Sequence, residues 1–220
     1  MTVGTADATR KRVLVGGLAL TAAAVAIQSL AHVVNVAFWD NNWDALNADS
    51  DTGAPAWASS VLEFAAALLV VLMAALQPAR QWPLFVLAAV LAFFSLDDLI
   101  MVHERVSTVA QDLDLWAHAG RLVWPVIFLP LLTIAFLGLW LIAAESVGDI
   151  ARPIRVGLGL LVLAIGLEIA AQGLFALDVG RLDAPFVAEV VVEEGAELAG
   201  WGLIVTGLAA ALLDSGLRAP

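Results

Sequence analysis

The chain has 220 residues, of which 62% are hydrophobic and only 14% are charged, and its mean hydropathy is +0.94. These values lie far outside the range of soluble globular domains and indicate an integral membrane protein. The formal net charge of −11 disfavours binding to nucleic acids and other anionic polymers. The absence of cysteine excludes disulfides and thiolate metal sites. Since Lys11 is the only lysine in the sequence, a retinal Schiff base within a membrane helix is also excluded.

Six apolar segments recur along the chain, each long enough to cross a hydrocarbon core ~30 Å thick, which takes about 20 helical residues. We expect an all-α bundle of six transmembrane helices that forms a single domain over residues 1–220. Prolines and tryptophans lie in or near the connections, as they do at the ends of membrane helices. The expected helices cover residues about 13–38, 57–77, 82–104, 121–143, 154–177 and 186–213.

The basic residues orient this bundle. The positive-inside rule places both termini in the cytoplasm, because most lysine and arginine residues then fall on the cytoplasmic side. We expect a multi-pass protein of a bacterial-type plasma membrane, with most of the acids in its outer half, where they would attract cations. We expect the polar segment 40–51 to form a solvated outer loop. The basic residues on the cytoplasmic side are Arg10, Lys11, Arg12, Arg80, Arg152, Arg155 and Arg218.

The segment FFSLDDLIMVHER places acids where a membrane helix would otherwise be apolar. Counted at 1.5 Å per residue from Trp82, Asp97 lies about 22 Å along the third expected helix, inside the ~30 Å core. Asp97 and Glu104 share a face of a straight helix, whereas His103 points about 120° away from Asp97. Only fraying or a bend near Val102 would direct all three side chains at one ion.

Acids at a similar depth follow on other expected helices. Glu168 lies about 20 Å along the fifth helix, and Glu193 and Glu197 share one face of the sixth because they are four residues apart. Glu63 and His32 bring the second and first helices into the same layer. Each ionisable group at membrane depth costs about 2.5 to 3.5 kcal/mol, so these residues are functional candidates by default. Glycines near the acids of the sixth helix would let neighbouring helices approach closely.

Carboxylates and an imidazole on facing helices are the ligands of di-iron and di-manganese bundles, and they also suit zinc. We therefore predict a divalent metal ion in the outer-leaflet layer, with iron, zinc, manganese and copper all compatible. The expected principal ligands are Asp97, Glu104, Glu193 and Glu197. The expected catalytic set, whose members are alternative ligands or proton-transfer groups, consists of Asp98, His103, Glu194 and Glu168.

The sequence has only three histidines, His32, His103 and His118. A bis-histidine haem needs two of them aimed across the bundle at one level, so we expect neither haem nor retinal. For His32, a hydrogen bond to Asn35 or to water competes with a ligand role. For His118, solvation in the loop after the third helix competes in the same way.

Three functions fit these residues. The first is a metal-dependent membrane enzyme, a hydrolase or an oxidase, that acts on a lipid-like substrate reached from the bilayer. The second is a transporter or channel for protons or divalent cations, which would use the same acids as a relay and would need a polar route to the cytoplasm. The third is an accessory subunit of a larger membrane complex, in which the acids are structural.

Two segments, SLDDLIMVHER and the downstream EEGAELAGW, carry a resemblance. Together they resemble a group of uncharacterised bacterial multi-pass membrane proteins that have Asp-Asp/Glu-x4-His-Glu and Glu-Glu-x-x-Glu segments. The resemblance implies a multi-pass membrane fold and implies no known activity.

Overall fold

The computed structural model describes residues 3–50, 52–112, 123–177 and 179–218, and this part of the chain is all α. Six of its helices are long and apolar enough to cross a membrane, which confirms the predicted fold class. An eleven-residue helix, α4, and two short 3-10 helices, η1 and η2, complete it. The elements are α1 (Val3–Trp39), η1 (Asp44–Leu46), α2 (Ala54–Leu76), η2 (Pro78–Arg80), α3 (Gln81–Ile100), α4 (Val102–Asp112), α5 (Val123–Glu145), α6 (Gly148–Ala176) and α7 (Ala184–Arg218).

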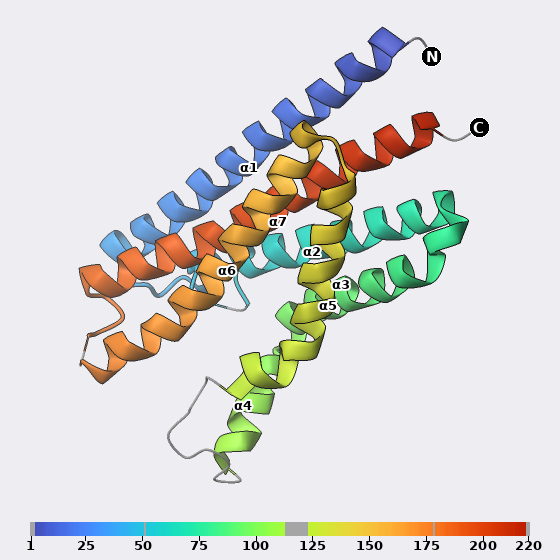
Figure 1. The fold of residues 1–220 in the computed structure, drawn as a ribbon. Helices are drawn as coiled ribbons and strands as arrows, with labels where there is room; N and C mark the ends of the chain where they lie inside the picture. The colour runs from blue at the N-terminus through green and yellow to red at the C-terminus, as the bar shows by residue number, and fades with distance from the viewer. Residues whose placement is uncertain (1–2, 51, 113–122, 178, 219–220) are drawn as a thin grey trace.

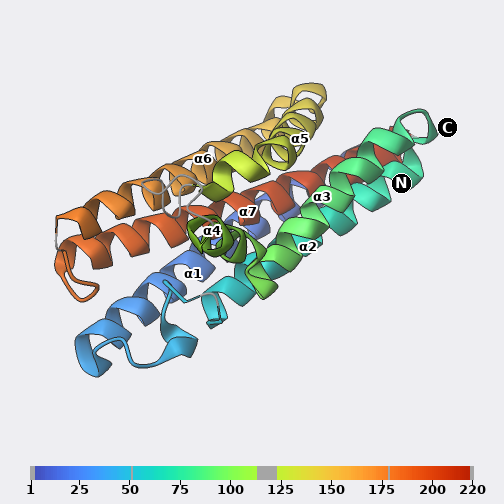
Figure 2. The ribbon, with the colours of Figure 1, turned by 90° about the horizontal axis from the view of Figure 1, so that it is seen from below.

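Helix α7 is the central element of the bundle, and it packs against α1, α2 and α6 (Figures 1 and 2). Helices α2 and α3 form a second closely packed pair, and α5 contacts α3, α4 and α6. Both termini lie at the same end of the bundle (Figure 1), which we call the terminal end, and the opposite end is the loop end. At the terminal end, Arg10 forms ion pairs with Asp149 at 3.3 Å and with Asp214 at 4.0 Å, which link α1 to α6 and α7.

The contact between α6 and α7 depends on two glycines. A Cβ atom at Gly157 would lie 2.6 Å from the backbone oxygen of Gly200, and a Cβ atom at Gly200 would lie 2.8 Å from the side chain of Leu161. Any side chain at these positions would therefore push the helices apart. We call this contact, made by Gly157, Gly200, Leu161 and Ile204, the glycine seam.

The predicted helix 82–104 is wrong at its outer end. Helix α3 ends at Ile100, Met101 adopts the left-handed conformation with φ 54°, and the chain continues in a different direction as α4 (Figure 1). The side chain of Asp97 accepts a hydrogen bond at 2.9 Å from the backbone N–H of His103. This bond satisfies a donor that the first turn of α4 would otherwise leave unpaired, so the aspartate stabilises the new helix start.

Other parts of the chain also differ from expectation. Helix α6 begins at Gly148, and Pro153, which we expected at a connection, lies inside it. The segment 40–51, expected as a solvated loop, includes η1 and has two buried residues, Asn47 and Ala48. Its fold depends on α1, because the Nδ1 atom of the buried His32 accepts a hydrogen bond at 3.1 Å from the Ala48 N–H.

Candidate metal centre

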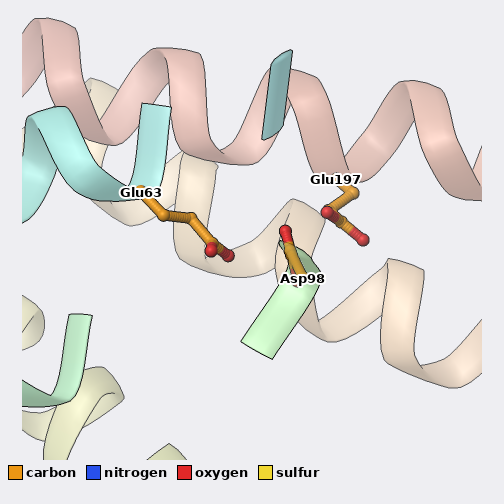
Figure 3. Close-up of side chains that lie close together, drawn as sticks. All are labelled: Glu63, Asp98 and Glu197. Carbon is orange, nitrogen blue, oxygen red and sulfur yellow. The ribbon is translucent and has the colours of Figure 1, made fainter. Parts of the chain in front are cut away.

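Three carboxylates from three helices meet near the loop end of the bundle. Glu63 comes from α2, Asp98 from α3 and Glu197 from α7, and one carboxylate oxygen of each lies within 4.8 Å of the other two (Figure 3). Figure 3 shows the side chains of Glu63 and Asp98 directed toward one another. We call these three residues the carboxylate triad. Its oxygens are close enough to serve as ligands of one metal ion.

The packing of α2 against α3 places Glu63 beside Asp98. The Ser60 hydroxyl donates a hydrogen bond at 2.8 Å to the backbone oxygen of Ser95 and lies 3.1 Å from its hydroxyl. Ser60 is three residues before Glu63, and Ser95 is three residues before Asp98. Residues three apart lie on the same side of a helix, so the serine contact brings the two acids together. Glu63 is only 4% exposed, and its Oε2 atom has no hydrogen-bond partner among the described residues.

The electrostatics of the triad require a positive charge or protons. Two like charges about 4 Å apart repel by about 4 kcal/mol at an effective dielectric constant of 20. Burial of Glu63 adds a desolvation cost, because a buried carboxylate has lost its water. Three ionised carboxylates at this spacing are therefore unstable unless a cation lies between them or the acids share protons.

A histidine and an aspartate lie next to the triad. The Nδ1 atom of His103 is 2.9 Å from Oδ2 of Asp97, and the His103 ring lies 5.3 Å from that of Trp124. Burial by itself lowers the pKa of His103, but the hydrogen bond to Asp97 and the charges of Asp97, Glu168 and Asp98 outweigh it and raise the pKa to about 9. His103 is therefore held as a proton donor to Asp97 at neutral pH.

The indole of Trp124 fixes a further acid. Its Nε1 atom donates a hydrogen bond at 2.9 Å to Oε1 of Glu168, so α5 holds the acid of α6 in place. Because Trp124 also contacts the His103 ring, one side chain positions both groups.

Two cavities meet at this layer. The polar one, about 360 Å³, lies on the loop-end side, and we call it the vestibule; residues of segment 40–51, α4 and α7 line it. The second, about 140 Å³, extends between α3, α5, α6 and α7 toward the terminal end, and we call it the apolar chamber. The residues that line both cavities are Asp98, His103, Glu168, Glu193 and Glu197.

Residues 9–212 match a protein-family model described as a domain of unknown function, DUF8692. The chain belongs to this family. No curated protein and no solved structure matches the chain. For this DUF8692 member, the family assignment together with the six long apolar helices supports the multi-pass architecture, and the family description names no activity.

The structure distributes the predicted site residues over the triad and the two cavities. Of the expected ligands, Glu197 belongs to the triad, Glu193 lines both cavities and Glu104 lines the vestibule. Asp97 lines the apolar chamber and contacts His103 through both carboxylate oxygens. Of the expected catalytic set, Asp98 is a triad member, His103 and Glu168 line both cavities, and Glu194 lines the vestibule.

Glu63 is the triad member that belongs to neither the predicted ligands nor the predicted catalytic set, whereas Asp98 was expected in the catalytic set. The depth of Glu63 in the second helix placed it in the same layer, but a depth count does not show which face of α2 meets α3. The sequence feature that could have identified Glu63 is the spacing of the small and polar residues around it. The buried residues Ser59, Ser60, Glu63, Ala66 and Ala67 follow one helical face.

His32 lies outside the carboxylate triad. His32 accepts its hydrogen bond from Ala48, whereas the Asn35 amide donates to Asn41 and to the Trp43 backbone oxygen. The expected partner Asn35 is therefore used elsewhere. His118 lies outside the described residues.

Proposed function

We propose that this protein is a metal-dependent membrane enzyme and that Glu63, Asp98 and Glu197 hold its divalent metal ion. One observation supports this most directly. Glu63 is 4% exposed and has an unpartnered carboxylate oxygen beside two further carboxylates from other helices. A cation would offset the mutual repulsion and the desolvation cost together, and an ion pair or hydrogen bond to only one acid would not.

The donor atoms favour one class of metal. Carboxylate oxygens are hard ligands that suit manganese, magnesium and calcium, whereas zinc, iron and copper favour sites with imidazole. Among the metals compatible with the sequence, we favour Mn²⁺. A divalent cation in such a site supplies Lewis-acid activation of water for hydrolysis.

The neighbouring residues suit proton transfer. Asp97 binds Nδ1 of His103 and so orients the imidazole, which leaves Nε2 as the atom that exchanges a proton with a substrate. Glu168, held by Trp124, lines the same cavities and provides a second proton acceptor. We therefore favour a hydrolase that acts on a lipid-like substrate over an oxidase.

The rival function, transport of protons or divalent cations, would need a polar route from the triad to the terminal end. The apolar chamber occupies that direction, and the side chains that line it away from the acids are Leu132, Ala135, Phe136, Leu139, Leu158 and Leu161. An ion would lose its hydration there without replacement ligands. This lining favours an enzyme over a channel.

Elemental analysis of the purified protein tests the proposal. We expect about one equivalent of metal per chain in the wild type, and loss of most of it in Glu63→Gln, Asp98→Asn and Glu197→Gln, because each removes a charged ligand. Glu104→Gln is the matched control, since Glu104 lines the vestibule without belonging to the triad, and it should retain the metal. A wild type without bound metal, even after dialysis against Mn²⁺, would exclude the proposed centre.

A further inference from the structure

We propose that the apolar chamber binds the hydrocarbon chain of a single-chain amphiphile, whose head group is a hydroxyl or an ammonium that faces the carboxylates. This inference deepens the proposed function, because it names the substrate class for the same site. It follows from the shape, the polarity and the hydrogen-bonding state of the chamber.

The shape of the chamber favours a single extended chain. Along α6 its lining runs from Leu158 to Glu168, which is about 15 Å at 1.5 Å per residue. Along α5 it runs from Trp124 to Leu139, so the chamber follows the helix axes. Its volume is about 140 Å³, which is small for a cavity that extends over that length. A volume that small over that length leaves room for one chain and excludes two chains or a fused ring system.

The polarity changes along the chamber in one direction. Toward the terminal end, leucine and alanine side chains surround it, whereas at the opposite end it meets the triad, His103 and Glu168. A purely apolar ligand would displace water from the carboxylates at one end, and a purely polar one would lose its hydration among the leucines at the other. An amphiphile satisfies both ends, with its chain toward the terminal end and its head at the acids.

The head group is constrained by what the acids can accept. Glu168 and Glu193 line both cavities without belonging to the triad, so the head group still faces carboxylates when a metal ion occupies the triad, and it must donate a hydrogen bond or carry positive charge. A phosphate or carboxylate head would be repelled by the acids of both cavities. The vestibule arginine, Arg181, is already paired with Asp49 at 2.9 Å. A hydroxyl or ammonium head fits this environment.

Photo-crosslinking tests the inference without requiring turnover. The probe is dodecanol with a diazirine in mid-chain, added to the full-length protein in nanodiscs after chelation of metals. We expect labelled peptides from α5 around residues 132–139 and from α6 around residues 158–165, and unlabelled dodecanol in excess should suppress that labelling. The matching diazirine dodecanoic acid should label these peptides several-fold less, because its head is anionic.

A pair of matched variants on α6 distinguishes the chamber from the lipid-facing surface. Ala164 is 5% exposed and lines the chamber, whereas Ala170 is exposed on the same helix. Ala164→Leu fills the chamber and should lower the labelling at least about tenfold, whereas Ala170→Leu should leave it within about twofold. Ala135→Leu narrows the chamber from α5 and serves as the second variant if Ala164→Leu does not fold.

Labelling that unlabelled dodecanol does not suppress in the wild type, or that spreads evenly over exposed positions, would overturn the inference. So would equal labelling by the alcohol and the acid. Because the protein is free of metal in this experiment, its outcome is independent of the elemental analysis. Specific labelling of a protein that binds no metal would leave the chamber assigned and exclude the metal centre. A protein that binds metal but shows no specific labelling would keep the metal centre and exclude the chamber.

Discussion

The glycine seam and the carboxylate triad lie on the same central helix, α7, and yet they are built on opposite principles. At the seam, Gly200 removes side-chain volume so that α6 and α7 touch through their backbones. Less than a turn away, Glu197 contributes a charge to a group of acids that repel one another. The seam gains stability from close contact, whereas the triad costs stability unless a ligand offsets its charge. Substitutions in the two regions should therefore have opposite effects on folding.

The largest expected effect is at the seam. Gly157→Ala should lower the free energy of unfolding by about 3 kcal/mol, because the new Cβ atom would lie 2.6 Å from the Gly200 backbone oxygen, which cannot move as a side chain can. Reversible unfolding in mixed micelles measures this. The control is Gly159→Ala on the same helix, where the Cβ atom meets nothing within 4 Å, and it should change stability by less than about 1 kcal/mol. Equal effects of the two variants would exclude the seam as a special contact.

A substitution in the triad should raise the stability of the metal-free protein, the opposite of the effect at the seam. Without metal, Glu63→Gln should stabilise the protein by about 1 kcal/mol, because it removes one buried negative charge. With Mn²⁺ at 100 times its dissociation constant, the wild type should gain about 2.7 kcal/mol and the variant almost nothing. Thermal unfolding with and without Mn²⁺ measures both effects. Destabilisation of the metal-free protein by Glu63→Gln would assign Glu63 a structural role.

The Asp97–His103 pair should make stability depend on pH. Because the folded-state pKa of His103 is about 9, above the ordinary value of about 6.5, the pair stabilises the fold fully below pH ~6.5. This stabilisation is lost as the pH rises through ~9. The loss should be on the order of 2 kcal/mol in metal-free protein. Asp97→Asn should remove most of the pH dependence between these values, and an unchanged dependence would contradict the assigned pair.

The smallest expected effect concerns the Trp124 hydrogen bond. Trp124→Phe should lower the free energy of unfolding by about 1 kcal/mol. The substitution removes the indole donor to Oε1 of Glu168 but keeps an aromatic ring near His103. Trp82→Phe is the matched control, since Trp82 is 79% exposed, and it should have no measurable effect. A larger loss of stability with Trp82→Phe than with Trp124→Phe would mean that the tryptophans act chiefly as membrane anchors.

Much of the architecture could be predicted because it depends on local composition. Apolar length predicted the six long helices, and the depth count placed Glu63, Asp97, Glu168 and Glu197 in one layer. The depth count could not decide whether Asp97 or Asp98 meets the acids of the other helices. Adjacent residues of a helix differ by only about 1.5 Å in height but by about 100° in direction. The break at Met101 brings His103 to Asp97, whereas Asp98, the next residue of α3, lies beside Glu63 and Glu197.

The sequence by itself determined that this chain is an all-α membrane protein with an excess of acids at one depth, because hydrophobic length and residue spacing are properties of the chain alone. Only the tertiary structure decided which acids meet, since that depends on helix rotation and on contacts between helices distant in sequence. The Ser60–Ser95 contact and the packing of α7 against α2 bring Glu63, Asp98 and Glu197 together, and no local pattern records either.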